Sequence, residues 1–269
     1  MSKEYKDGIF IDLLKNNVKE AKTLINKLVR YKTEWVIPTN AISDEELYIS
    51  MKSWLKEQPP ADTDSNIQVY RSKARVKQFS QIFQVLYFNN YNKTYLDYGA
   101  GSGEISRGIG KFLKLKRPIY MCDVDQWHDE KHIEEKKSDW VFKFIKNNII
   151  PFSQKFDIIS SLMVLHHVPD QEKSIKDLYE HLGSKGLLII REHDIDTTVV
   201  RNMAHIEHAI HNIVYEDQSF KEFCKDYIGD YKSAIEWKEI FSKHTGWKCV
   251  YADTPTGPTK YFYFVMQKN

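Results

Sequence analysis

Apolar residues recur at helical spacing along the first third of the chain. Between residues 9 and 30 they fall three or four positions apart with lysines between them, which predicts an amphipathic helix. Residues 43–46, Ser-Asp-Glu-Glu, have the composition of a helix cap and predict a second helix that ends before Pro59-Pro60. The polar residues 61–66 predict a loop, and the spacing of apolar residues over 72–88 predicts a third helix.

From Thr94 onward the pattern changes to short apolar strands that alternate with helices. Strands are predicted at 94–98, 118–123, 142–145, 156–161 and 186–192, and the clearest helices at 104–114 and 171–182. This alternation implies right-handed crossovers and a parallel sheet. Residues 196–244 are predicted to form a mostly helical insertion. Two closing strands are then predicted at 247–251 and 260–266, joined by a proline- and glycine-containing turn.

The composition is that of a globular protein with an ample core. Of 269 residues, 42% are hydrophobic and 13% aromatic, enough for one large domain or for one domain with a sizeable appendage. We expect residues 1–90 to form a helical amino-terminal region that packs on a core formed by residues 91–269.

Charge and cysteine content exclude several classes of protein. The 39 basic and 37 acidic side chains give a net charge of only +2, so any nucleic-acid surface must be local. The three cysteines are isolated, which predicts neither a metal site nor a disulfide framework and suits a reducing compartment. No apolar run approaches the length of a membrane span, and no signal-peptide pattern is present. We therefore expect a cytoplasmic protein without a membrane segment.

The most informative stretch is a glycine-rich turn. A short apolar run ends in Asp97, and Gly99, Gly101 and Gly103 follow at alternate positions before a helix start over 104–109. A strand, a tight glycine turn and a helix in this order let the backbone pass close to a nucleotide-like ligand. The spacing G-x-G-x-G differs from the G-x-G-x-x-G of dinucleotide-binding folds, and this difference argues against a dinucleotide site.

The pattern D-x-G-x-G-x-G resembles motif I of the class I S-adenosylmethionine (SAM) methyltransferases. The resemblance implies a SAM-dependent methyltransferase with a Rossmann-like α/β sheet, mostly parallel with an antiparallel closing strand, preceded here by the amino-terminal helices. It implies that Gly99, Gly101 and Gly103 let the backbone approach the methionine part of SAM. Asp97 would orient the turn or meet the ammonium group of the cofactor.

A second carboxylate stands where the ribose of SAM is expected. The strand predicted at 118–123 ends in Asp123, about 20 residues after the glycines, at the distance from which an acid accepts ribose hydroxyls in related folds. Asp125 is the alternative if the register of this strand is shifted. A cap or a solvated turn residue is the structural alternative for such an aspartate.

The adenine side departs from the family pattern. Many members carry an aspartate a few residues before a Pro-Phe pair, whereas the residues before Pro151-Phe152 include no acid here. Asn147 is the candidate, because its carboxamide oxygen can accept from the adenine amino group. Ser161 and Leu162 are expected to line the site mainly through their backbone. The pair His166-His167 is a candidate metal or base site, although L-H-H-V is a common packing sequence in small-molecule methyltransferases.

A basic element precedes the glycine turn. Arg71-Ser72-Lys73-Ala74-Arg75-Val76-Lys77 resembles an element of the FtsJ-like RNA ribose 2′-O-methyltransferases, in which the last lysine belongs to a Lys-Asp-Lys-Glu tetrad. Lys77 takes the place of that lysine, and Arg71, Lys73 and Arg75 suit contacts with the phosphates of an RNA substrate. A solvated basic helix face is the structural alternative.

The rest of the tetrad is missing. The expected aspartate falls on Leu162, the second lysine on Arg191, and the glutamate near Tyr261. Instead, the fifth strand ends in Arg191-Glu192-His193-Asp194, where this fold presents its substrate. Glu192 or His193 is a candidate base, with a helix cap by Asp194 as the structural alternative.

Three functions remain open from the sequence. The first is a methyltransferase that acts on RNA, as the basic element indicates. The second is a methyltransferase for a small molecule or a protein, as the missing tetrad and the insertion at 196–244 indicate. The third is a non-catalytic SAM-fold subunit that binds RNA or stimulates a partner enzyme.

Overall fold

The computed structural model describes residues 8–29, 36, 38, 40–57, 64–86, 92–124, 139–146, 149–243, 246–257 and 259–269. The chain divides into two compact units. Unit 1 comprises Met1–Asp64, His193–Ala234 and Pro255–Tyr261, and unit 2 comprises Ser65–Glu192, Ile235–Thr254 and Phe262–Asn269. The amino-terminal helices therefore share a unit with much of the predicted insertion. The predicted boundary near residue 90 and the packing of residues 1–90 on the core stay predictions.

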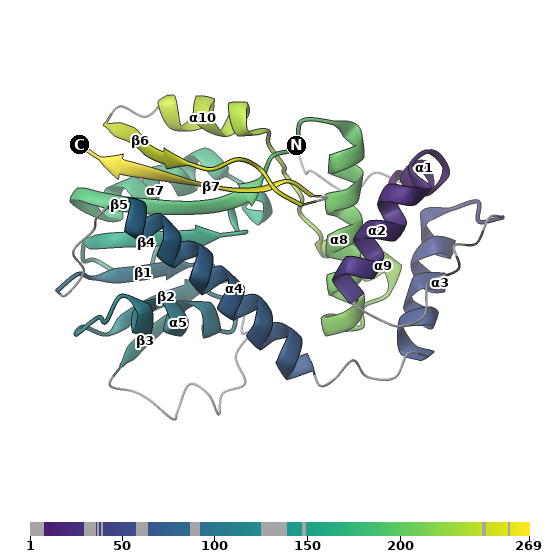
Figure 1. Cartoon of the computed structure of the whole chain (residues 1–269), viewed down its shortest axis with the longest axis horizontal. Helices are drawn as coiled ribbons and strands as arrows, with labels where there is room; N and C mark the ends of the chain where they lie inside the picture. The colour runs from purple at the N-terminus through teal and green to yellow at the C-terminus, as the bar shows by residue number, and fades with distance from the viewer. Residues whose placement is uncertain are drawn as a thin grey trace. The chain divides into compact units, whose positions relative to one another are not determined.

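A mixed sheet forms the centre of unit 2 (Figure 1). Its strands are β1 (Tyr95–Tyr98), β2 (Ile119–Asp123), β3 (Trp140–Phe144), β4 (Phe156–Leu162), β5 (Leu182–His193), β6 (Trp247–Ala252) and β7 (Tyr261–Lys268). They lie in the order β3-β2-β1-β4-β5-β7-β6. The pairs from β3 to β5 are parallel and the pair β6–β7 is antiparallel. This confirms the predicted sheet and places its switch point between β1 and β4.

Helices cover the sheet of unit 2. They are α4 (Asp64–Val85), α5 (Glu104–Phe112), the short 3₁₀ helix η1 (Leu165–His167), α7 (Gln171–His181) and α10 (Ala234–Ser242). On one face, Phe79 of α4 and Ile109 of α5 belong to the same buried cluster as Met121 of β2 and Ile189 of β5. Because strand side chains alternate between the two faces, this cluster fixes which strand residues point toward α4 and α5.

Unit 1 is helical. It contains α1 (Ile9–Asn16), α2 (Val18–Val29), α3 (Asp44–Glu57), α8 (Thr198–Glu216) and α9 (Phe220–Asp226). The first three helices pack on α8, and Phe10, Tyr48, Ile206 and Phe223 are among the buried residues that they share. Among the described helices, none combines the length and the apolar character that crossing a bilayer requires.

Two helix boundaries differ from the prediction. The helix predicted over 9–30 is broken at Asn17, whose carbonyl accepts the N–H of Ala21 at 3.0 Å and so begins α2; asparagine is a poor helix former and a good cap. Helix α4 begins at Asp64, so the loop predicted over 61–66 is wrong from residue 64 onward. No glycine or proline lies between 61 and 85 to end a helix there. Residues 61–63 and 87–88 lie outside the described part.

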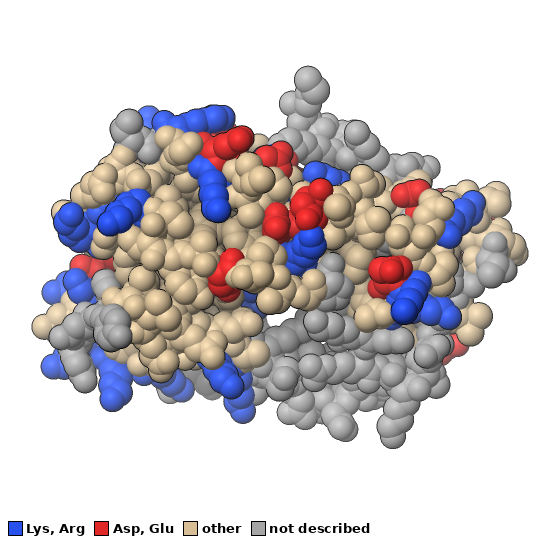
Figure 2. Space-filling view, turned by 45° about the horizontal axis from the view of Figure 1, so that its top comes forward, with Lys and Arg blue, Asp and Glu red and all other residues tan. Residues whose placement is uncertain are grey.

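Charges of both signs lie close together on the surface drawn in Figure 2. Several basic side chains are paired with acids of their own unit. Lys52 meets Asp217 at 2.8 Å in unit 1, and Lys243 meets Glu172 at 2.8 Å in unit 2. Local pairing of this kind agrees with the small net charge of the chain.

Tyr48 joins α3 to α8 through a buried hydrogen bond, which gives a test of unit 1. Its hydroxyl donates to Asn212 Oδ1 at 2.7 Å. We expect Tyr48→Phe to cost about 1 kcal/mol, because the amide oxygen loses a buried partner, and to lower the Tm by about 2–4 °C. Thermal unfolding measures this. The exposed variant Lys22→Ala is the control and should leave the Tm unchanged.

Candidate functional site

The glycine turn stands at the carboxyl ends of β1 and β2. The N–H groups of Gly99 and Ala100 both donate to the carbonyl of Cys122, at 2.8 and 3.2 Å. Gly99 and Gly101 have φ values of +76° and +51°, which side-chain-bearing residues rarely adopt. A Cβ built on Gly101 would meet no heavy atom within 4 Å. The turn thus leaves open space directly over its backbone, and Gly103 then begins α5.

Asp123 lies beside this open space. Its Oδ2 accepts the N–H of Gly101 at 2.7 Å and its Oδ1 accepts the N–H of Val124 at 2.7 Å. The structure therefore brings together Gly101 and the carboxylate predicted to hold the ribose. A carboxylate oxygen can accept more than one hydrogen bond, so the turn and Asp123 suit a ligand that bears hydroxyl groups. The alternative acid Asp125 lies outside the described residues, as does Asn147, the candidate for adenine.

Asp97 is occupied inside the protein. Its two carboxylate oxygens accept hydrogen bonds from Ser106 of α5 at 2.6 Å and from Ser160 of β4 at 2.5 Å. Burial raises the pKa of Asp97 to about 6, an effect that the two serine hydrogen bonds oppose and the charge of Asp123 reinforces. These contacts support the predicted role in orienting the turn. The predicted contact with the ammonium group of SAM stays a prediction.

Two neighbouring serines at the end of β4 point to opposite faces of the sheet. Ser160 points toward Asp97, so Ser161, the next residue, lies on the opposite face of the sheet. Ser161 is fully buried, and its hydroxyl has no hydrogen-bond partner in the described part of the chain. Its backbone pairs with Tyr98 at the end of β1. Contact with the cofactor through the backbone of Ser161 therefore stays a prediction.

The segment that follows β4, residues 163–166, is anchored to the end of β5. The N–H of Met163 donates to the carbonyl of Arg191 at 2.8 Å. Glu192 Oε1 accepts the N–H groups of Val164 and Leu165 at 3.1 and 2.8 Å, and its Oε2 lies 2.5 Å from Nδ1 of His166. Burial raises the pKa of Glu192 to about 8, although the backbone donors oppose the rise.

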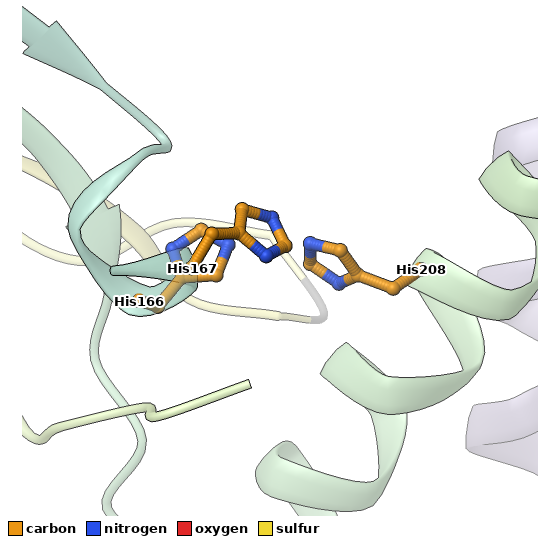
Figure 3. Close-up of side chains that lie close together, drawn as sticks. All are labelled: His166, His167 and His208. Carbon is orange, nitrogen blue, oxygen red and sulfur yellow. The ribbon is translucent and has the colours of Figure 1, made fainter. Parts of the chain in front are cut away.

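The histidine pair is divided between core and surface. His166 is fully buried and bonded to Glu192, whereas His167 is exposed. Both rings come from η1 (Figure 3), with centroids 4.1 Å apart. The bond to Glu192 supports a packing role for His166. The third residue labelled in Figure 3, His208, belongs to α8 in unit 1.

His193, a candidate base, belongs to a group of histidine and tyrosine rings in unit 1. Its Nδ1 lies 2.8 Å from the carbonyl of Thr259, which can only accept, so the N–H is on Nδ1. The neutral ring then carries its lone pair on Nε2. The rings of Tyr231 and Tyr261 lie 5.4 and 5.1 Å away. His193 is thus held in one tautomer within an aromatic surrounding.

A chain of hydrogen bonds lies beside His193. His208 Nδ1 lies 2.8 Å from the carbonyl of Ala204 and therefore donates. It also lies 2.8 Å from the hydroxyl of Tyr231, which is 2.5 Å from that of Tyr227. The Tyr227 hydroxyl ends the chain at His205 Nδ1, 2.9 Å away. Burial lowers the pKa of His205 to about 3, so this ring is neutral.

This chain of hydrogen bonds was not predicted from the sequence. Its signal was present as two histidines three positions apart, His205 and His208, which lie on the same side of a helix. The tyrosines that complete it, Tyr227 and Tyr231, are about twenty residues further along the sequence, and no local pattern connects them to the helix.

The predicted acceptor-side cations lie on α4. Lys73 and Lys77 are exposed and one helical turn apart. Arg75 is half-buried, and its charge lowers the pKa of Asp97. The side chain of Arg71 lies outside the described residues. Lys73 and Lys77 can therefore meet a polyanion, whereas Arg75 is turned toward the core of unit 2.

The remaining tetrad positions hold no carboxylate. Leu162 is buried in the apolar cluster under α4 and α5. Arg191 is 7% exposed, with its guanidinium carbon 5.8 Å from the centre of the Tyr263 ring. Tyr261 donates its hydroxyl to Glu207 of unit 1. Asp194 accepts the N–H of Ala234 at 2.7 Å, the residue that begins α10, as the predicted helix cap requires.

Comparisons with known proteins agree on one family. The profile of a family described as "Methyltransferase domain" matches residues 70–252, more than half of the chain. A carboxy-S-adenosyl-L-methionine synthase of Staphylococcus epidermidis is 23% identical over 169 residues, which are 61% of this chain and 71% of that protein. A ubiquinone biosynthesis O-methyltransferase of Glaesserella parasuis is 28% identical over 106 residues, 37% of this chain and 45% of that enzyme.

A solved structure shares the fold. The magnesium protoporphyrin IX methyltransferase of Synechocystis PCC 6803, determined with bound SAH, superposes with a TM-score of 0.53 and 12% identity. The match covers 78% of this chain and 88% of that one. At this identity the likeness is one of fold.

Gly101 and Asp123 give a direct test of the cofactor site. Gly101→Val fills the open space above the turn, and Asp123→Ala removes the proposed acceptor of the ribose hydroxyls. Hydrogen bonds to a charged group contribute about 1.5–3 kcal/mol, so Asp123→Ala should weaken SAM binding about 10- to 100-fold in calorimetry. Asp123→Asn keeps an acceptor for the Gly101 N–H and should lose less.

A matched control separates the site from backbone strain. Gly8 also has a positive φ, +94°, and open space around a built Cβ, but lies in unit 1. Gly8→Ala should therefore leave SAM affinity unchanged. Parent-like affinity in both Gly101→Val and Asp123→Ala would contradict the assignment.

The buried carboxyl of Asp97 predicts a pH dependence of folding. Its pKa is raised from 3.8 to about 6 in the fold, so its protonated form is the stable one. Relative to Asp97→Asn, the parent should therefore lose stability as pH rises from 3.8 through 6, by roughly 3 kcal/mol in all. Urea unfolding of both proteins from pH 3 to pH 7 measures the difference.

Asp157 provides a control of opposite sign. Thr94 and Lys93 hold its pKa below the ordinary 3.8 against the effect of burial. The stability that it contributes is present above pH 3.8 and is lost as the pH falls. A parent-minus-variant difference for Asp97→Asn that is flat, or that has the slope of Asp157→Asn, would contradict the assignment.

Proposed function

This chain belongs to the methyltransferase domain family and uses SAM as its cofactor, and we propose that it methylates a small molecule. The names of its relatives support this class of acceptor. Ubiquinone biosynthesis and magnesium protoporphyrin IX both denote small-molecule chemistry in those proteins.

The observation that carries the proposal is the composition of the tetrad positions. In RNA ribose methyltransferases of the resembling type, the lysine belongs to a Lys-Asp-Lys-Glu tetrad whose members share protons. Here the two carboxylate positions hold the buried Leu162 and the half-buried Tyr261. Arg191 replaces the second lysine and cannot share a proton. Lys77 therefore lacks the relay that would make it a base.

The chemistry that remains is positioning and proton removal. Bound SAM supplies an electrophilic methyl carbon; the S–CH₃ bond breaks as the bond to the acceptor forms, and a hydroxyl acceptor also loses its proton. We propose His193 as the residue that takes this proton, because its Nδ1–H is held by Thr259 and its Nε2 carries the lone pair. Glu192, the other candidate base, already accepts the N–H groups of Val164 and Leu165.

RNA is the second candidate acceptor. Lys73 and Lys77 are exposed on the same side of α4, and this observation favours a phosphate-binding helix face. Such a face contributes binding through counterion release, independently of the missing tetrad.

Incubation with methyl-labelled SAM decides between these acceptors. The full chain is offered small hydroxylated aromatic compounds, a cell metabolite extract, proteins, and capped and uncapped RNA. We expect label in the small-molecule fraction, and His193→Gln should reduce it by a factor on the order of 10² or more while SAM affinity is retained.

Label in RNA would contradict the proposal and support the second candidate. In that case RNA affinity should fall steeply with salt. Replacing Arg71, Lys73, Arg75 and Lys77 with alanine should flatten that salt dependence by somewhat under one unit for each lost phosphate contact.

A further inference from the structure

Glu192 stands near the carboxyl end of β5, and its carboxylate lies against the segment 163–166 that follows β4. Its side chain is 1% exposed. It accepts the N–H groups of Val164 and Leu165, and the N–H of His166 also faces it. Three successive backbone donors at the start of η1 form a small anion-binding concavity that the carboxylate fills.

The histidine side chain completes this arrangement. His166 Nδ1 lies 2.5 Å from Glu192 Oε2, so the ring and the carboxyl group share a hydrogen bond. His166 is itself fully buried. Gln171 adds a bond from its side-chain nitrogen to the carbonyl of Leu165 at 3.1 Å. The segment 163–166 is therefore held both through its backbone N–H groups and through the carbonyl of Leu165.

The segment bears directly on the glycine turn. A Cβ built on Gly99 would lie 2.3 Å from Cγ2 of Val164, so the valine side chain rests on the backbone of Gly99. Gly99 in turn donates to Cys122, next to Asp123. Val164 therefore limits how far the turn can move toward β5.

Met163 shows that the segment is under constraint. Its φ of +67° is unusual for a residue with a side chain. The conformation is fixed by the bond from its N–H to the carbonyl of Arg191 on one side and by the bonds of Val164 and Leu165 to Glu192 on the other. Such strain persists where the surroundings determine the backbone.

We propose that Glu192 is a positioning residue of the SAM site: it holds residues 163–166 so that Val164 keeps the turn at Gly99 in its cofactor-binding shape. This role extends the cofactor site by a residue whose oxygens contact only the protein's own donors in the described structure. It concerns SAM alone, so it stands or falls independently of the acceptor proposed above.

Calorimetry with SAM on the full chain tests the proposal. Glu192→Ala should bind SAM at least tenfold more weakly than the parent. Glu192→Gln should stay within about threefold, because the carboxamide oxygen accepts the same N–H groups and the carboxamide nitrogen can donate to His166. Equal affinity of the parent and Glu192→Ala would overturn the proposal, as would a Glu192→Gln variant as weak as Glu192→Ala.

Two further variants keep the test decisive. Ser219→Ala removes the N-cap of α9 in unit 1, whose hydroxyl accepts the N–H of Glu222 at 3.3 Å, so it lowers stability without touching the segment and should leave SAM affinity unchanged. Val164→Ala leaves Glu192 in place but removes the methyl groups that rest on Gly99, and it should weaken SAM binding severalfold. If Glu192→Ala does not fold, parent-like affinity in Val164→Ala overturns the proposal.

A spectroscopic signature accompanies the affinity. With histidine labelled in nitrogen-15, the short His166–Glu192 contact should give a strongly downfield imidazole proton in the parent. This signal should vanish in Glu192→Ala and also in Glu192→Gln, where the carboxamide nitrogen donates to Nδ1 instead, while Val164→Ala retains it. Its persistence in Glu192→Ala would show that His166 is held by another group and would also overturn the proposal.

Discussion

One buried carboxylate joins the three elements that form the cofactor turn. Asp97 ends the apolar run of β1, and its oxygens accept from Ser106 on α5 and from Ser160 on β4. The turn between β1 and α5 therefore cannot move without breaking bonds that cross the switch point of the sheet. Burying the carboxylate is costly, as the raised pKa shows, and two hydroxyl donors offset part of that cost.

A second buried carboxylate performs a comparable task on the other side of the turn. Glu192 receives the backbone donors of residues 164 and 165, and Val164 reaches Gly99 from there. Asp97 fixes the turn through hydrogen bonds from two side-chain hydroxyls. Glu192 fixes the segment 163–166 through hydrogen bonds from backbone N–H groups. In both cases the sequence offers an acid as a candidate functional residue, and the structure shows that acid holding backbone or side-chain donors of the protein. Carboxylates near a cofactor are therefore poor indicators of proton transfer until their partners are known.

The parts of the fold that were predictable are those encoded by local spacing. The strand of Asp97, the three glycines and the helix start at Glu104 are contiguous, and β2 ends at Asp123 as its apolar run indicates. The break at Asn17 and the start of α4 at Asp64 depend on capping and on the absence of helix breakers, to which apolar spacing is insensitive. Glu192 was found as a polar residue at a strand end, but its partners Val164 and His166 are nearly thirty residues away. Some acids accept hydrogen bonds from a distant segment, and others face a ligand. No pattern within one element distinguishes the two kinds.

The same reasoning explains why the acceptor is harder to infer than the cofactor. The proposed SAM site consists of a backbone turn and one carboxylate, and both leave a signature in contiguous sequence. The candidate base His193 depends on the carbonyl of Thr259, 66 residues further along the chain, and only that bond assigns its lone pair to Nε2. The neighbouring chain from His208 through Tyr231 and Tyr227 to His205 begins beside the carbonyl of Ala204, which can only accept and so places the proton of His208 on Nδ1. Its tyrosines lie about twenty residues beyond the histidines that they bond. Bonds of this kind assign a tautomer only once the fold brings the partners together, so the group that accepts a proton leaves no pattern in contiguous sequence.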